Sequence, residues 1–359
     1  MSSILILSNT TFILVTPLNW GLGHASRCIP IIKALKENGF TPVIASDGNS
    51  LELLKKEFPE DIFEVLPNYN IEYAKNGKDF KFKIIKQIPR LLLAIAREKK
   101  IISKLIKKYP IKGILSDNRF GVYHKSIPSI YITHQIQVLS GNTSWISTKL
   151  HQHFIKKFDQ CWIPDVKEGL NLSGKLSHVE NLPKNCRFIG PLTRFKKESY
   201  PVKNDLLIIL SGPEPQRTLL EDKLLLELKD YKNPIVLVRG IVENQQVITK
   251  DGTLTTYNFM DSKELEKTIH ESDKVICRSG YTTIMDLAFL EKKAFFIPTP
   301  GQFEQEYLAK KLKKEGSIPS CKQEKFTAEK LHNIDIYTGF RKIDFSKNWA
   351  ELFSLFKRK

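Results

Sequence analysis

The feature that most constrains the fold is residues 274–309, KVICRSGYTTIMDLAFLEKKAFFIPTPGQFEQEYLA. The apolar run 275–277 predicts the end of a buried strand, and the Arg-Ser-Gly run at 278–280 then interrupts the pattern. Apolar residues at helical spacing follow from Thr282, and the run 294–297 predicts a second strand. Such a unit places a helix N-terminus at the carboxyl edge of a parallel sheet, where anionic ligands bind.

Three polar side chains follow the strands of this segment. Asp286 lies about a turn and a half past Gly280, where a carboxylate suits a pair of ribose hydroxyls. Glu304 and Gln305 follow the second strand. Because the carboxyl ends of parallel strands share one edge of the sheet, these two residues are expected to face the same crevice.

The segment resembles the nucleotide-sugar site of glycosyltransferases of families 28 and 1, which have the GT-B fold, and in particular that of the peptidoglycan N-acetylglucosaminyltransferases. The Cys-Arg-Ser-Gly run, the acid six positions later and the glutamine of the next loop carry the resemblance. It implies that Asp286 binds the donor ribose and that Glu304 and Gln305 bind sugar hydroxyls. It also implies that the turn and the helix start bind the donor diphosphate, through Arg278, Ser279, Gly280 and Thr282. For this segment alone, a generic strand–helix–strand unit of a Rossmann-like protein remains the alternative.

Length and composition indicate a two-domain, reducing-compartment protein. A chain of 359 residues exceeds the size at which single cores stop growing. The five cysteines are scattered without paired or metal-like spacing, which favours a reducing cytoplasm over a disulfide framework. None of the apolar runs approaches the roughly 18 residues that cross a bilayer.

The net charge is +17, and it is concentrated in residues 78–108, which hold eleven basic and two acidic side chains among many apolar ones. This stretch predicts a basic, apolar helix broken once at Pro89. It is either a membrane-surface element or a core helix with a solvated basic face. The overall charge favours an anionic membrane surface or simply reflects a lysine-rich composition. Nucleic-acid recognition motifs are absent, so a nucleic-acid partner is not expected.

The first domain opens with a strand at 12–16, a glycine loop containing Gly21 and Gly23, and a helix that begins near His24. One interpretation is a dinucleotide fingerprint with Asp47 as ribose ligand, although Ser26 stands at its third position. The other is the first glycine loop of GT-B transferases, which ends in a histidine that acts as base. A dehydrogenase would leave the C-terminal segment unexplained, so the transferase is favoured. The positive helix end lowers the pKa of His24, which keeps the neutral imidazole that a base requires.

Two further strands of this domain end in polar residues. The strand at 111–115 leads to Asp117, and the resemblance to family 1 makes Asp117 the residue that orients the catalytic His24. The next strand ends at His134 and Gln135, which would lie on the acceptor side together with Gly21 and Gly23. The peptidoglycan enzymes have His-Glu-Gln there, and the missing acid leaves the acceptor open. His134 is otherwise a capping or core histidine.

Domain boundaries follow from composition. The predicted units are an acceptor-side domain at 1–195, a charged linker at 196–204, a nucleotide-sugar domain at 205–340 and a returning C-terminal helix within 341–359. By resemblance, the remaining donor-site residues come from three places. These are the exit of the first domain, the loop after the strand at 206–210, and the position that contacts the uracil ring in members of the family. The residues are Arg194, Ser211, Gly212 and Met260. Prolines replace two glycines of the family's diphosphate loop, so this match is partial.

The predicted fold is GT-B, an α/β fold with two doubly wound, Rossmann-like parallel-sheet domains that face a central cleft. The resemblance implies an inverting glycosyltransferase with a UDP-linked or other nucleotide-sugar donor, a hydroxyl acceptor that is a sugar or lipid-linked, and a cytoplasmic location that is peripheral at the inner face of the plasma membrane. The nucleotide sugar is a substrate, and no cofactor is implied; without an Asp-x-Asp motif nothing calls for a metal. The alternatives are a nucleotide-sugar epimerase on the same fold and a non-catalytic sugar-nucleotide or polyanion-binding protein.

Overall fold

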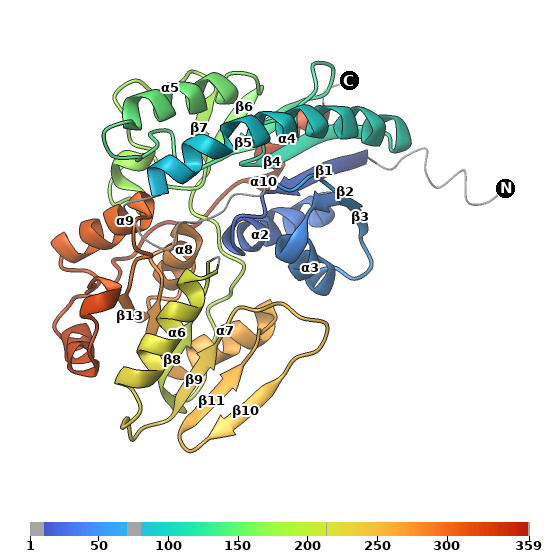
Figure 1. Ribbon diagram of the computed structural model, residues 1–359. Coiled ribbons are helices and arrows are strands. Elements are labelled where there is room, and N and C mark those ends of the chain that lie inside the picture. The colour runs from blue at the N-terminus through green and yellow to red at the C-terminus, as the bar shows by residue number, and fades with distance from the viewer. Residues whose placement is uncertain (1–10, 70–79, 213, 358–359) are drawn as a thin grey trace.

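Two parallel α/β sheets, one in each half of the chain, form the framework of the molecule (Figure 1). The computed structural model describes residues 11–69, 80–212 and 214–357, with helix positions 80–88 described by their backbone alone. The prediction of two doubly wound domains is confirmed, with the N-terminal sheet in the upper half of Figure 1 and the C-terminal sheet in the lower half.

The N-terminal sheet has seven parallel strands in the order β3-β2-β1-β4-β5-β6-β7. Its central strands are apolar on both faces, as expected where helices cover both sides. The order reverses between β1 and β4, whose last residues Pro17 and Asp117 are paired, so a crevice opens at their carboxyl ends. The strands are β1 (Thr11–Pro17), β2 (Phe40–Ser46), β3 (Ile62–Val65), β4 (Ile111–Asp117), β5 (Ser129–Ile132), β6 (Gln160–Ile163) and β7 (Cys186–Phe188).

The helices of this domain are α2 (Gly23–Glu37), α3 (Gly48–Glu57), α4 (Phe80–Lys108) and α5 (Ser144–Ile155). The 29 residues of α4 form one helix that includes Pro89, so the predicted break is wrong. A proline removes a single helix hydrogen bond, and four buried side chains beyond it, Ala94, Ile95, Ile102 and Leu105, anchor the helix. Within the described residues, none of the helices combines the length and apolar character needed to span a membrane.

The C-terminal sheet has six strands in the order β10-β11-β9-β8-β12-β13, and only β10 runs antiparallel to its neighbour. Its switch point lies between β8 and β12. Asp261 caps the N-terminus of α7 by accepting from Glu264 N at 2.7 Å. The strands are β8 (Asn204–Ile209), β9 (Ile235–Val238), β10 (Ile248–Asp251), β11 (Leu254–Tyr257), β12 (Ser272–Cys277) and β13 (Lys293–Phe296). The helices are α6 (Gln216–Glu227), α7 (Ser262–His270), α8 (Tyr281–Phe289) and α9 (Phe303–Lys314).

The end of the chain crosses back to the N-terminal domain through α10 (Trp349–Leu352) and the 3-10 turn η6 (Phe353–Lys357). The Phe353 and Phe356 rings lie 5.8 and 6.2 Å from Phe40, edge to face. Phe356 also fills the space beside Gly113, where any side chain would overlap the ring. The returning segment therefore packs against the N-terminal ends of strands β2 and β4.

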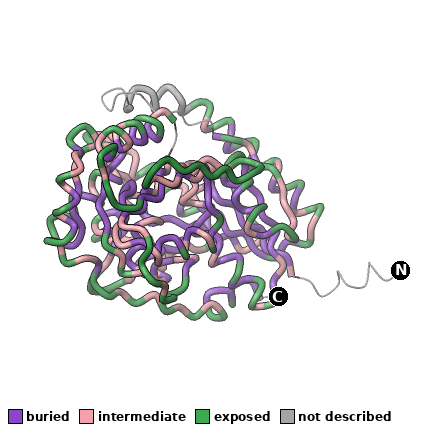
Figure 2. The backbone as a smooth tube through the Cα atoms, turned by 90° about the horizontal axis from the view of Figure 1, so that it is seen from below, coloured by how far each residue is buried: buried purple, intermediate pink, exposed green. Residues whose placement is uncertain are grey.

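A single apolar cluster continues from one domain into the other. It contains Ala25 and Ile29 of α2 together with Tyr281 and Ile284 of α8. Figure 2 shows buried backbone in the interior of the molecule and exposed backbone around it. Because this contact is buried and apolar, the two switch points are held close together at the domain interface.

Candidate active site

His24 and Asp117 meet at the crevice of the N-terminal sheet. His24 lies in the first turn of α2, and Asp117 is the last residue of β4. The Nδ1 atom of His24 lies 2.7 Å from Asp117 Oδ1, while 14% of the His24 side chain remains exposed and Asp117 is fully buried. The structure thus brings together the two residues that were expected to form the base and its orienting carboxylate.

Arg27, which the sequence analysis did not single out, completes this group. It lies one turn after His24 on the same face of α2. Its Nε and Nη2 groups donate to both oxygens of Asp117. A basic residue three positions after a catalytic histidine on a helix was the one signal that could have identified it.

The charges of this group fit a neutral base beside an ionised carboxylate. Burial alone would raise the pKa of Asp117, but the charges and hydrogen bonds of Arg27 and His24 lower it to about 2. Burial lowers the pKa of His24, Arg27 lowers it further, and Asp117 offsets part of the decrease. Near neutral pH, His24 is therefore uncharged and can accept a proton.

The helix N-terminus of the C-terminal domain faces this group. Gly280 is the N-cap of α8, and a Cβ atom there would contact only Thr283 Oγ1, at 4.0 Å. Thr282 Oγ1 donates to the Gly23 carbonyl oxygen at 3.0 Å, so the starts of α2 and α8 touch across the interface. The unpaired N–H groups at these two helix starts form a positive environment that suits an anionic group.

Glu304 crosses the interface to the residues expected on the acceptor side. Its Oε1 atom lies 2.7 Å from His134 Nε2, and its Oε2 atom accepts from the Gln135 side chain. The His134 ring stacks on Tyr281 with centroids 4.2 Å apart and an angle of 7° between the planes. A residue predicted to bind the donor and two predicted on the acceptor side thus form one cluster.

Arg278, Ser279 and Gln305 direct their polar groups into the protein. The guanidinium of Arg278 donates to four oxygens, those of the Ile297, Pro298 and Gln216 carbonyls and of the Gln323 side chain, at 2.7–3.1 Å. Burial lowers the pKa of Arg278 to about 9. Ser279 Oγ donates to the Gln305 carbonyl oxygen at 2.8 Å, and Gln305 Oε1 accepts from Thr299 N at 2.8 Å. These side chains shape the loops around the cleft, and their backbone remains the part that can face a donor.

Asp286 of α8 contacts the chain segment that joins the domains, and Arg194 belongs to that segment. Asp286 is 6% exposed, and Thr193 Oγ1 donates to it at 2.8 Å. Burial raises the pKa of Asp286 to about 6, although Arg194 and Thr193 partly offset that rise. Arg194 Nη1 donates to Ser262 Oγ at 3.1 Å.

The remaining predicted donor residues lie at the ends of C-terminal strands. Ser211 and Gly212 follow β8 and are half-buried, and Gly212 has a φ of 98°, which favours glycine. Met260 is 7% exposed within the apolar cluster that joins the domains. In the N-terminal domain, Gly21, which was predicted on the acceptor side, has a φ of 77° and open space where a side chain would stand.

Asp47, the ribose ligand of the dinucleotide interpretation, has another role. It accepts from the buried Arg119 and, at 3.1 Å, from the Asn19 side chain. Arg119 Nη1 also donates to the buried Glu98 of α4 at 2.9 Å. Asp47 therefore helps to attach α4 to the sheet.

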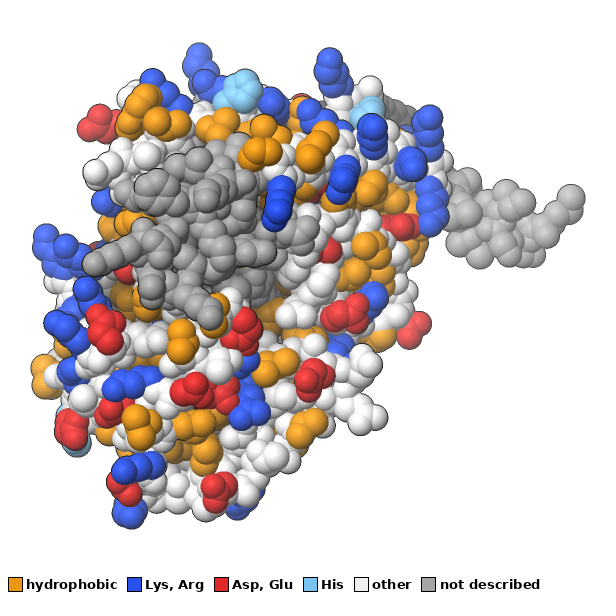
Figure 3. Space-filling view, viewed as in Figure 1, with side chains coloured by type: hydrophobic (Ala, Val, Ile, Leu, Met, Phe, Trp, Pro, Cys, Tyr) orange, Lys and Arg blue, Asp and Glu red, His pale blue; other side chains and the backbone are white. Residues whose placement is uncertain are grey.

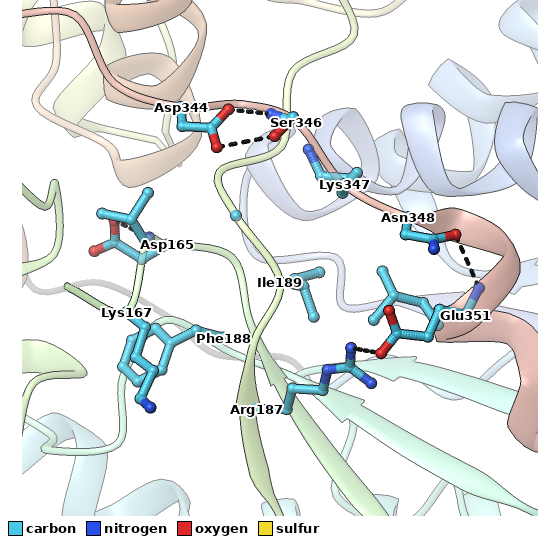
Figure 4. A pocket seen from close by; sticks show the side chains of 13 residues that line it. Asp165, Lys167, Arg187, Phe188, Ile189, Asp344, Ser346, Lys347, Asn348 and Glu351 are labelled. Atoms are coloured by element: carbon cyan, nitrogen blue, oxygen red, sulfur yellow. Dashed lines mark hydrogen bonds and ion pairs between the residues drawn. The ribbon is translucent and has the colours of Figure 1, made fainter.

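A cavity of about 250 Å³ lies away from these residues, where the C-terminal segment crosses β7 (Figure 4). Arg187 and Glu351 form an ion pair at its edge, and Lys347 Nζ donates to the Pro191 carbonyl oxygen at 2.8 Å. Burial lowers the pKa of Lys347 to about 8. None of the predicted site residues lines this cavity.

Comparison with known proteins agrees with this geometry. Residues 215–347 match the glycosyltransferase family 28 C-terminal domain. An uncharacterized glycosyltransferase of Methanopyrus kandleri is 21% identical over 303 residues, which cover 79% of this chain and 84% of that protein. The UDP-N-acetylglucosamine–N-acetylmuramyl-(pentapeptide) pyrophosphoryl-undecaprenol N-acetylglucosamine transferase of Sulfurihydrogenibium sp. is 25% identical over 324 residues, covering 86% and 84%.

Solved structures share the whole fold. The spinosyn rhamnosyltransferase SpnG in complex with thymidine diphosphate superposes with a TM-score of 0.62 at 13% identity, covering 97% of this chain and 95% of that one. The MurG crystal structure from Acinetobacter baumannii gives a TM-score of 0.51 at 17% identity and covers 92% of each chain. These matches extend over both domains.

Proposed function

Since this chain is a GT-B glycosyltransferase with a family 28 C-terminal domain and uses a nucleotide-sugar donor, we propose that it is an inverting enzyme that transfers the sugar of a UDP-linked donor to a hydroxyl group. One observation carries this proposal. The His24–Asp117 pair, 2.7 Å apart, stands opposite the N-terminus of α8 at the meeting point of two sheet switch points.

His24 acts as the general base. When its Nδ1–H donates to Asp117, the lone pair on Nε2 is available to take the proton of the acceptor hydroxyl. Asp117 then stabilises the imidazolium that forms, as the ionised carboxylate does in hydrolase triads. The deprotonated hydroxyl attacks the anomeric carbon on the face opposite the diphosphate, so the configuration at that carbon inverts.

The donor lies against the C-terminal domain. The N-terminus of α8 at Gly280 and the loop at Ser211 and Gly212 supply backbone N–H groups to the diphosphate as it departs. Asp286 holds the ribose: a carboxylate has about four acceptor positions, and the Thr193 hydroxyl and the Arg194 backbone N–H use two of them. Glu304 binds sugar hydroxyls through the acceptor positions that its contacts with His134 and Gln135 leave free.

The acceptor is a lipid-linked sugar at an anionic membrane surface. Figure 3 shows basic side chains interspersed with apolar ones along the upper edge of the molecule, over α4 and α5. The exposed apolar residues there are Leu92 and Leu93 of α4 and Trp145, Ile146 and Leu150 of α5, each at least 50% exposed. We call these five residues the apolar patch. The basic positions 78–88 of the predicted membrane segment lie outside the residues whose side chains are described.

Chemistry and charge support this acceptor class. Phe154 of α5 packs against the apolar cluster that contains Ala94 and Ile95 of α4, so the apolar patch lies on two neighbouring helices. An exposed apolar surface with basic side chains around it suits a reversible membrane contact. The name of the Sulfurihydrogenibium relative specifies a pyrophosphoryl-undecaprenol acceptor, which is an anionic lipid.

The test is a turnover assay with a panel of nucleotide sugars, with and without acceptor lipid. Acceptor-dependent release of nucleoside diphosphate supports transfer, whereas donor turnover without acceptor supports the epimerase. His24→Ala should reduce turnover by about 10²–10⁴-fold with nearly unchanged donor binding, and Asp117→Asn should reduce it less. His332, an exposed histidine of the C-terminal domain, provides the control His332→Ala. Wild-type turnover in His24→Ala would exclude His24 as the base.

A further inference from the structure

Five titratable or charged side chains form a continuous chain of contacts between the two domains, and Arg27 lies at its centre. Arg27 is 2% exposed and donates to Asp117 through Nε and Nη2. Its Nη1 group lies 2.9 Å from His134 Nδ1, and its Nη2 group lies 2.9 Å from His24 Nδ1. His134 Nε2 in turn contacts Glu304 of the C-terminal domain at 2.7 Å.

The hydrogen-bond roles in this chain determine the tautomer of His134. A guanidinium has five N–H donors and cannot accept. Because Arg27 Nη1 donates to His134 Nδ1, that atom must carry a lone pair, and the ring proton is on Nε2. Nε2 then donates to Glu304, and stacking on Tyr281 keeps the ring in this plane. Glu304 of one domain thus stabilises the form of His134 that accepts from Arg27 in the other.

The same counting gives His24 two exclusive states. Its Nδ1 atom lies near Asp117 Oδ1 at 2.7 Å and near Arg27 Nη2 at 2.9 Å, but it cannot donate and accept at once. If Nδ1 donates to Asp117, Nε2 is unprotonated and can act as a base. If Nδ1 accepts from Arg27, the proton is on Nε2 and the base is blocked. The charge-assisted bond to Asp117 favours the first state.

We propose that Arg27 is a positioning residue that links the contact between Glu304 and His134, which crosses the domain interface, to assembly of the base. It orients Asp117 so that His24 takes the Nδ1–H form. It also holds His134 in the Nε2–H form, which donates to Glu304 of the other domain. This inference rests on the proposed glycosyl transfer at the same site. If Glu304 is removed, His134 Nε2–H loses the acceptor that stabilises its tautomer. Arg27 Nη1 then loses the Nδ1 lone pair, and His24 Nδ1 becomes the competing acceptor for the guanidinium.

The charges around His24 predict how the group responds to substitution. Asp117 faces it from β4, Arg27 and Cys28 from α2, His134 from the loop after β5, and Glu304 from α9. Burial lowers the pKa of His24, Asp117 raises it, and Arg27 and His134 lower it. Cys28 Sγ lies 3.7 Å from Asp117, and burial raises the pKa of its thiol, which stays uncharged. Loss of the Arg27 charge should therefore raise the pKa of His24.

The experiment measures histidine tautomers directly, by long-range ¹H–¹⁵N NMR of the full-length chain without ligand. In the wild type, His24 should be the Nδ1–H form and His134 the Nε2–H form. In Arg27→Met, Asp117 loses the two hydrogen bonds that orient it toward His24 Nδ1. The His24 signal should therefore shift toward a mixture of tautomers, and its titration should move to higher pH. Arg27→Lys keeps the positive charge but not the two parallel guanidinium donors. It should therefore return the titration of His24 to the wild-type pH range and leave its tautomers mixed. Arg341→Met, at an exposed arginine, is the control and should change neither signal.

Glu304→Ala leaves the buried pair of Arg27 and Asp117 unchanged. It therefore tests the coupling from Glu304 through His134 and Arg27 to His24 even if Arg27→Met does not fold. It should shift His134 away from the Nε2–H form and, through Arg27, change the His24 tautomer. In the turnover assay, Arg27→Met should reduce kcat by about 10²-fold, the effect of a displaced catalytic group. An unchanged His24 signal in Arg27→Lys and Glu304→Ala would overturn the proposal, even if transfer is observed. Correct tautomer shifts in a chain without transfer activity would instead refute the proposed function alone.

Discussion

Replacing Asp286 by Asn should make the protein more stable at alkaline pH and weaken its hold on the donor. Asp286 is buried beside Thr193, and burial raises its pKa from 3.8 to about 6 against the opposing effects of Arg194 and Thr193. A difference of two pKa units corresponds to about 3 kcal/mol of preference for the protonated form. Asn keeps an acceptor for Thr193 but loses the attraction to Arg194. We therefore expect the free energy of unfolding at pH 8 to increase by about 1–3 kcal/mol.

The pH dependence of this gain has a defined sign. A carboxyl group whose pKa is raised by folding destabilises the folded state when it is ionised. Above pH 6 Asp286 is ionised in the folded chain, and its full cost is present. Between about pH 6 and pH 4 the folded chain takes up a proton that the unfolded chain does not hold, and the cost is lost. The advantage of Asp286→Asn should therefore be greatest at pH 8 and absent at pH 4.

Urea unfolding at pH 8, 6 and 4 measures this difference by linear extrapolation. Asp230→Asn, at an exposed aspartate, should show no such dependence on pH. In the same preparations, calorimetry should show UDP-sugar binding weakened by about 1.5–3 kcal/mol, because the ribose loses a charged acceptor. A stability difference that does not vary with pH would refute the electrostatic reasoning. Unchanged UDP affinity would refute the ribose assignment.

Two further predictions concern residues outside the reacting centre. Arg278→Met should lower the free energy of unfolding by about 2–4 kcal/mol, because it leaves three buried carbonyl oxygens and the partly buried Gln323 side-chain oxygen without their donor. A melting temperature as high as that of Arg341→Met would contradict this role. The protein should co-sediment with anionic vesicles at low salt and be released as salt rises, because charge is screened over about 10 Å at 0.1 M. Trp145→Ser combined with Arg90→Glu should weaken this binding, and equal sedimentation of variant and wild type would shift the acceptor toward a soluble molecule.

The parts of the fold that were predictable are those specified by local pattern. The apolar runs that became β4 and β12 are buried on both faces, and the glycine turns after β1 and β12 lead into α2 and α8. The position of His24 and Asp117 also follows from topology. Asp117 ends β4, and His24 begins the helix that follows the neighbouring parallel strand β1. The order of the strands therefore brings the two residues to one edge of the sheet, where they meet at 2.7 Å.

Side-chain direction was not predictable, because it depends on packing between elements. Arg278 stands in a glycine turn that faces the cleft, yet its guanidinium lies among carbonyl oxygens on the protein side. The pairing of His134 with Glu304 joins residues that are 170 positions apart. Sequence reasoning assigned them to opposite substrates because it had no information on the distance between the two domains.

Buried charges in this protein fall into two kinds, and the difference indicates where the ligands bind. Arg119 donates to Asp47, to Glu98 and to two carbonyl oxygens, and its partners are buried, so this group attaches elements and has little capacity left. Along the cleft, by contrast, some charged or titratable side chains keep hydrogen-bonding positions that the protein does not fill. Asp286 stays acidic at a cost to folding, and His24 keeps 14% of its side chain exposed with Nε2 unpaired among the described residues. A buried charge that the fold satisfies contributes to stability, whereas one that the fold leaves partly unsatisfied must be retained for what binds to it. On this reasoning we propose that the donor binds between Asp286 and Glu304 and that the acceptor hydroxyl approaches from the exposed edge of His24.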